Sequence, residues 1–101
     1  MKNLLLFICV LLTASFLSAE ITFEEHAIDN SFNAVTGIAC ADINGDGSAD
    51  VIGCSSSGQL AWWKHNEQGI WQKQIIDYLP DAMCICAAYI DADNQIDIVA
   101  C

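Results

Sequence analysis

The sequence repeats itself with a period close to 48 residues, and this restricts the fold more than any other feature. Three short segments recur in the same order, at spacings of 48, 49 and 47 positions. Their first copies are residues 26–29, 42–44 and 50–54, and their second copies are residues 74–77, 91–93 and 97–101. Three matches in one order make chance a poor explanation. A period of roughly 40–50 residues is typical of propeller and solenoid arrays.

The local pattern after residue 19 is that of β-strands. The apolar runs are short, they are bounded by clusters of Gly, Asn, Asp, Ser or Pro, and helical periodicity is not sustained anywhere. Tight turns are expected at Ser55–Gly58 and at Asn66–Gly69, where the glycine tolerates a positive φ. The expected strands are Ile21–Ile28, Val35–Ile43, Ala49–Cys54, Gln59–His65, Ile70–Ile76, Ala82–Ile90 and Ile96–Cys101.

Four of these strands fall within one period, residues 35–76, which is the size of one propeller blade. The strand before it matches the last strand of a blade, and residues 82–101 match the first half of the next blade. We therefore expect an all-β fold of β-propeller-type blades, with about one and a half blades present. Closed propellers need about 4–8 blades. The chain is therefore expected to be a partial or truncated gene product, or one that completes itself by association.

Residues 1–19 have the features of a secretory signal peptide. Lys2 precedes the apolar run Leu4–Leu12, and small residues lead to Ala19, where we expect cleavage. The alternative is an uncleaved membrane anchor, but a spanning helix needs roughly 20 apolar residues. We expect a protein of residues 20–101 that does not insert into a membrane. Its expected location is secreted or extracytoplasmic, which includes the extracellular space, the cell surface and the periplasm.

The segment after residue 19 is strongly acidic. It holds 13 Asp and Glu residues against two lysines, a formal charge of −11. This charge argues against nucleic acid and anionic membranes as partners. Six of the acids form two tight clusters, which suits carboxylates that are neutralised by bound cations. These acids are Asp42, Asp46, Asp50, Asp91, Asp93 and Asp97.

Five cysteines follow the predicted signal peptide: Cys40, Cys54, Cys84, Cys86 and Cys101. An odd number leaves at least one thiol unpaired within the chain. No pair has the spacing of a zinc site. Cys84 and Cys86 would share one face of a strand, where we interpret them as small buried apolar residues. The disulfide pairing cannot be deduced from the sequence.

The first acidic cluster has the spacing of a calcium loop. Its side chains stand at positions 1, 3, 5 and 9 of a short turn, and calcium takes 6–8 oxygen ligands. Gly45 and Gly47 let the backbone wrap closely, and three carboxylates this close would repel one another without a cation. The alternative is an acidic turn that binds no ion. The expected ligands are the side chains of Asp42, Asn44, Asp46 and Asp50 and the carbonyl of Ser48.

Other metal-loop types fit less well. An EF-hand needs a Glu at position 12 and flanking helices, whereas position 12 here is Gly53 and both flanks are expected strands. Magnesium prefers fewer carboxylates and retains water.

The stretch Ala41–Ile52 resembles the calcium loop of FG-GAP/VCBS-type repeats, which are the repeats of integrin-α-like β-propellers. Residues 60–66 and 71–77 resemble the third and fourth strands of that repeat. The resemblance covers nearly all of the chain after the predicted signal peptide. It implies that the loop joins the first two strands of a blade and that the residues at matching positions bind calcium.

The second acidic cluster departs from this pattern. Residues 91–97 are two positions shorter, lack both glycines and carry Gln95 at the third ligand position. Asp91, Asp93 and Asp97 could still face one ion, but a degenerate turn that keeps the fold is favoured.

The sequence favours a binding or scaffold role over catalysis. It has no phosphate loop, His-x-x-x-His pair or nucleophile elbow, so no catalytic residue is expected. Trp62, Trp63 and Trp71 are expected to pack between blades. The leading hypothesis is a secreted calcium-binding propeller module, with structural calcium and a protein or carbohydrate ligand. Self-association also stays open. The alternatives are the propeller part of an extracellular polysaccharide lyase or hydrolase, and a truncated product without independent function.

Overall fold

The computed structural model describes residues 19–101. The signal peptide predicted for residues 1–19 therefore lies outside the described residues, apart from Ala19. The described part contains strands, turns and irregular segments, with no helix. It accordingly contains no helix that is long and apolar enough to cross a membrane.

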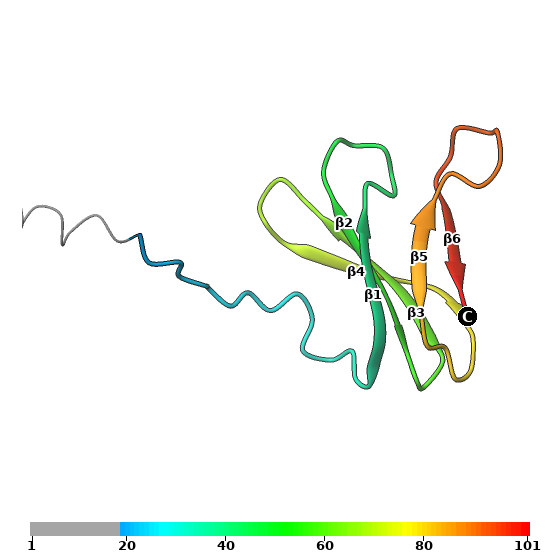
Figure 1. Ribbon diagram of the computed structural model, residues 1–101, viewed down its shortest axis with the longest axis horizontal. Helices are drawn as coiled ribbons and strands as arrows, with labels where there is room; N and C mark the ends of the chain where they lie inside the picture. Colours follow the sequence, from blue (N-terminus) through cyan, green and yellow to red (C-terminus); the bar gives the residue numbers. More distant parts are fainter. Residues whose placement is uncertain (1–18) are drawn as a thin grey trace, which may run out of the picture.

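Within residues 19–101, six strands form two sheets (Figure 1). The strands are β1 (Val35–Ala41), β2 (Asp50–Ser55), β3 (Gln59–His65), β4 (Trp71–Tyr78), β5 (Ile85–Ala88) and β6 (Asp97–Ala100). The larger is an antiparallel sheet in which each strand pairs with the next along the chain, in the order β1-β2-β3-β4. A two-stranded antiparallel sheet, β5-β6, follows. The expected fold class is confirmed: the fold is all-β, with one four-stranded, blade-like sheet and half of another.

Both predicted hairpin turns are present. Gly58 has a φ of 95°, and its N–H donates to the Ser55 carbonyl at 2.9 Å between β2 and β3. Gly69 has a φ of 77°, and its N–H donates to the Asn66 carbonyl at 3.0 Å between β3 and β4. The Asn66 side chain also accepts the N–H of Ile70 at 2.8 Å. The turn residues therefore fix where β3 begins and ends.

The four-stranded sheet buries side chains on both faces. Alternation along a strand sends successive side chains to opposite faces, so Trp62 and Trp63 separate as predicted. We call one side the hairpin face, because the β5-β6 hairpin and the segment before it pack on it. Its buried residues are Ile52, Cys54 and Leu60, with Ala82 and Ile85 against them. We call the other side the N-terminal face. Its buried residues are Val51, Ala61 and Trp63, with Phe32 against them.

The strand predicted at Ile21–Ile28 is wrong. This segment pairs with no strand among residues 19–101 and is largely exposed, with Phe23 94% accessible. Apolar alternation alone cannot form a strand, because a strand needs a neighbour for its backbone hydrogen bonds. Figure 1 shows this segment leading away from the sheets. The chain reaches the N-terminal face at Ile28, Asp29 and Phe32.

The other strand boundaries differ from the prediction by a few residues. β3 matches its predicted range, whereas β5 is four residues long instead of nine. Asp81 has a φ of 58°, and the Ala82 N–H donates to the Leu79 carbonyl at 3.2 Å. Because of this turn, β5 begins at Ile85 and not at Ala82 as predicted.

Candidate metal centre

The first acidic loop connects β1 to β2, the position that the sequence predicted. Gly45 and Gly47 have φ values of 73° and 86°. A Cβ at either position would meet no atom within 4 Å. The backbone conformation, rather than a lack of space, therefore requires glycine at both positions.

The half-buried Asp42 side chain lies at the centre of this turn. One of its oxygens accepts the N–H of Asp46 at 3.1 Å, and the other accepts the N–H of Gly47 at 2.9 Å. Asp42 therefore holds the loop closed around its own carboxylate.

Asn44 and Asp46 contact each other across the loop. The Asn44 amide donates to Asp46 Oδ2 at 3.0 Å, while Asn44 Oδ1 accepts the Asp46 N–H at 3.2 Å. Asp46 Oδ1 accepts the N–H of Ser48 at 2.8 Å. The Ser48 N–H, followed by the Asn44 amide, lowers the pKa of Asp46 below its usual value. These hydrogen bonds favour an ionised carboxylate that can pair with a cation.

Asp50 is the first residue of β2 and is fully buried. Its Oδ2 accepts the N–H of Ile43 at 3.1 Å, but its Oδ1 is buried without any hydrogen-bond partner. A buried charged oxygen without a partner is costly. A hard cation that prefers oxygen ligands would satisfy it, and the loop offers carboxylate, amide and carbonyl oxygens. The residues present therefore fit calcium.

The loop is not a ready-made cage of charged side chains. Nowhere in residues 19–101 do three or more His, Cys, Asp or Glu side chains lie together in a way that could hold a metal. Asp42 and Asp46 instead bind backbone N–H groups of the loop itself. Ser48 joins this network through its N–H, and the ligand role expected for its carbonyl stays a prediction.

The second acidic turn repeats part of this arrangement. Asp97 Oδ2 accepts the N–H of Ile90 at 2.9 Å, as Asp50 accepts that of Ile43. Asp91 and Asp93 each accept one N–H from two residues further along the chain, at 3.0 and 2.8 Å. Asp97 is only half-buried, unlike Asp50. The second turn thus keeps the hydrogen bond between the residue before the turn and the first aspartate of the following strand, but this aspartate is not fully buried.

A comparison with protein families agrees with this duplication. A family model described as an FG-GAP-like repeat matches residues 42–100, which are 59 of the 101 residues and include both acidic turns. The chain belongs to the FG-GAP-like repeat family. No curated protein and no solved structure matches it. The family match and the four-stranded antiparallel sheet together indicate a β-propeller-type module.

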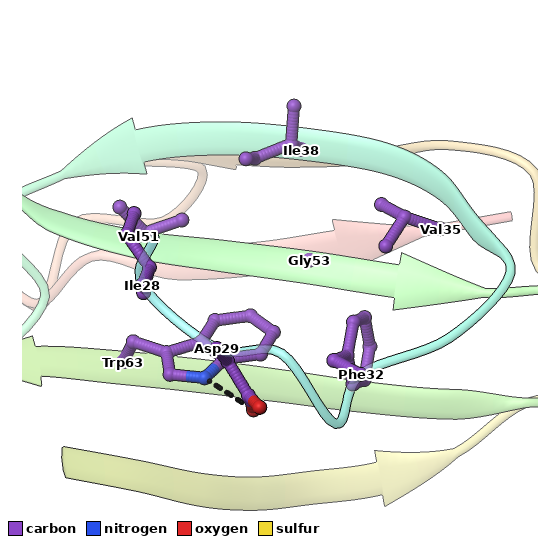
Figure 2. A pocket seen from close by; sticks show the side chains of 8 residues that line it. All are labelled: Ile28, Asp29, Phe32, Val35, Ile38, Val51, Gly53 and Trp63. Carbon is purple, nitrogen blue, oxygen red and sulfur yellow. Dashed lines mark hydrogen bonds between the residues drawn. The ribbon is translucent and has the colours of Figure 1, made fainter. Parts of the chain in front are cut away.

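A second feature of this FG-GAP repeat chain is an apolar hollow of about 110 Å³ on the N-terminal face (Figure 2). Its lining residues are Ile28, Asp29, Phe32, Val35, Ile38, Val51, Gly53 and Trp63. Gly53 leaves room for the indole of Trp63, because a Cβ there would lie 3.1 Å from the ring. The Phe32 ring meets the same indole edge-on, with a centroid distance of 4.8 Å.

Asp29 is the polar residue of this hollow, and the sequence did not single it out. Its Oδ2 accepts the indole N–H of Trp63 at 3.0 Å and lies 3.2 Å from Lys73 Nζ. Its Oδ1 accepts the N–H and the hydroxyl of Ser31 at 2.7 and 2.6 Å. The Ser31 bonds, together with Trp63 and Lys73, hold the pKa of Asp29 well below its usual range. Asp29 therefore attaches the N-terminal segment to β3 and β4.

Proposed function

We propose that this FG-GAP repeat chain is a calcium-stabilised, exported β-propeller-type module that binds or scaffolds a partner. The observation that carries the proposal is the buried carboxylate of Asp50, whose Oδ1 has no hydrogen-bond partner at the end of an oxygen-rich loop.

The ligands in this proposal come from both ends of one short loop. Asp42 follows β1 directly, and Asp50 opens β2. Asp46 lies between them with a lowered pKa, and Asn44 and Ser48 would add neutral oxygens. Bound calcium supplies positive charge and coordination positions for such oxygens. Residues that share one ion would hold β1 to β2, so the free energy of binding would add to the stability of the fold.

The net charge and the predicted signal peptide support the proposed export and the proposed kinds of partner. Residues 1–19 have the pattern of an export signal, and a formal charge of −11 after residue 19 suits a protein that works among cations. The same charge disfavours nucleic acid as a partner. We propose a protein or carbohydrate ligand and structural calcium without catalysis, and we retain self-association as part of the proposal.

Calorimetric titration of the full chain with calcium tests this function. We expect about one equivalent of calcium to bind the wild type and none to bind Asp46→Ala, because that variant removes the central carboxylate of the loop. Asp77→Ala is the matched control, since Asp77 is an exposed β4 carboxylate outside the loop that accepts the N–H of Tyr78 at 2.7 Å. Binding that is absent in the wild type, or equal in both variants, would contradict the proposal.

A further inference from the structure

The β5-β6 hairpin brings two cysteines directly opposite each other. The Cys84 N–H donates to the Cys101 carbonyl at 3.0 Å, and the Cys101 N–H donates to the Cys84 carbonyl at 3.1 Å. The pair continues the register of the hairpin, in which Ile85 faces Ala100 and Cys86 faces Val99. Cys84 and Cys101 thus form a hydrogen-bonded antiparallel pair.

The Cα spacing of such a pair lies within the range of a disulfide, and its Cβ atoms, roughly 4.5–5.5 Å apart, must approach to about 3.5–4.5 Å as the bond forms. Opposite residues that exchange both hydrogen bonds have Cα atoms roughly 5.5 Å apart. Disulfides span Cα distances of about 4.4–6.8 Å, with a mode near 5.5–6 Å. Directly opposed side chains also leave the sheet on the same face. Ile85, Ala87, Ile98 and Ala100 pack toward the hairpin face of the large sheet, so Cys84 and Cys101 lie on the opposite, outer side.

The environment of the two thiols agrees with this placement. The nearby Cys84 side chain raises the pKa of Cys101 above its usual value. Cys84 and Cys101 are exposed, so a dissolved oxidant can reach them. Cys86 is exposed as well, so the burial predicted for Cys84 and Cys86 is wrong: among residues 19–101, the outer face of the hairpin has no element packed on it.

No other cysteine has a cysteine across from it in the strand pairings of residues 19–101. Cys40 faces Val51, and Cys86 faces Val99. Cys54 is buried in the core, opposite Gly37 on one side and Leu60 on the other.

We propose that Cys84 and Cys101 form a cross-strand disulfide that locks the β5-β6 hairpin. The oxidant is a small disulfide such as oxidised glutathione. One cysteine thiolate attacks it, forms a mixed disulfide and releases one glutathione thiolate. The second cysteine thiolate then attacks the protein sulfur of the mixed disulfide and releases the other. The two cysteine thiols lose two electrons and two protons in total, and the oxidant becomes two thiols.

The bond would constrain the part of the fold with the shortest strands. β5 and β6 have four residues each and enclose the second acidic turn, which carries Asp91 and Asp93. A covalent link at the open end closes a loop that includes this turn. It reduces the freedom of the unfolded chain and keeps the two strands in register.

Peptide mapping of the full chain tests the bond. The chain is folded in a glutathione redox buffer, its remaining thiols are alkylated, and it is cut before aspartate without reduction. Asp81 and Asp91 bound one peptide, and Asp97 begins another, so Cys84 and Cys101 fall in separate peptides. We expect peptides 81–90 and 97–101 to be recovered as one linked species, lighter than their sum by two hydrogen atoms. This species should separate on reduction.

Variants and a denatured control make the result specific. The first peptide also contains Cys86, so Cys86→Ser should keep the linked species and Cys84→Ser should lose it. The linked species should be more abundant after folding than after oxidation in concentrated urea, where strand register cannot select the partner. Recovery of an alkylated 97–101 peptide, a link that survives in Cys84→Ser, or an equal yield in urea would overturn the proposal.

Discussion

Asp29 and Asp50 are both carboxylates that the fold withdraws from solvent, but they are satisfied to different degrees. Asp29 contacts Ser31, Trp63 and Lys73, and both of its oxygens are used. Asp50 uses one oxygen and leaves the other without a partner. The first carboxylate therefore stabilises the protein through contacts with the protein's own residues, whereas we propose that the second does so only with a bound cation.

Asp29 should give the protein a stability that depends on pH. Its pKa is lower in the folded chain than in the unfolded chain. Its contribution is therefore complete above the unfolded value near 3.9 and is lost as the pH falls toward the lower folded value. We expect Asp29→Asn to lower the free energy of unfolding by about 1–2 kcal/mol at pH 7, and by clearly less at pH 3, in urea titrations.

Glu24→Gln is the control for this experiment. Glu24 is exposed, and its contact with His26, at 3.5 Å, is also exposed. The control should leave stability almost unchanged at both pH values. A loss in Asp29→Asn that is the same at pH 3 and pH 7 would show that the carboxylate charge is not what holds the segment.

At the scale of elements, the contact between the large sheet and the hairpin depends on a small residue in β1. A Cβ at Gly37 would lie 3.0 Å from Cys54 Sγ and 3.1 Å from the Cys84 Cα. It would also lie 3.2 Å from the backbone nitrogen of Ile85. Two of these neighbours are backbone atoms, so the segment that leads into β5 would have to move to make room for the added Cβ.

We therefore expect Gly37→Ala to destabilise the protein by about 1–3 kcal/mol through overpacking. Hydrogen exchange should be faster at the amides of β5 and β6. Gly53→Ala is the comparison, because its added Cβ would meet the ring of Trp63 on the other face. That variant should change tryptophan fluorescence without loosening the hairpin. Equal protection of β5 and β6 in Gly37→Ala and the wild type would contradict this account.

The elements also show which parts of the fold were predictable. The predicted range of β3 is correct because the turns that contain Gly58 and Asn66 lie directly before and after the strand, and both depend on local residues. The acidic loop was placed correctly because its spacing is local as well. The strand predicted at residues 21–28 is wrong because a strand needs a partner strand, which the local sequence pattern does not specify. Asp29 was missed because its partners Trp63 and Lys73 are 34 and 44 positions away.

At the scale of the whole molecule, the fold gathers negative charge where two strands must meet. Asp42, Asp46 and Asp50 lie within nine residues that join β1 to β2, in a chain whose segment after residue 19 has a formal charge of −11. Without a cation, their repulsion opposes folding. With a cation, the same carboxylates add to stability. We therefore propose that bound calcium changes the effect of Asp50 on the free energy of unfolding from destabilising to stabilising.

The most direct test is the free energy of unfolding of the wild type and of Asp50→Asn, measured by urea titration with calcium and with a chelator. Asparagine can still accept the Ile43 N–H, but it removes the buried charge. In chelator, we expect the variant to be as stable as the wild type or more stable, by up to about 2 kcal/mol. In calcium at about 100 times the dissociation constant, we expect the wild type to gain roughly 2.7 kcal/mol, and the variant to gain little. If Asp50→Asn is destabilised equally in both conditions and calcium stabilises neither chain, the loop is an acidic turn and the account is contradicted.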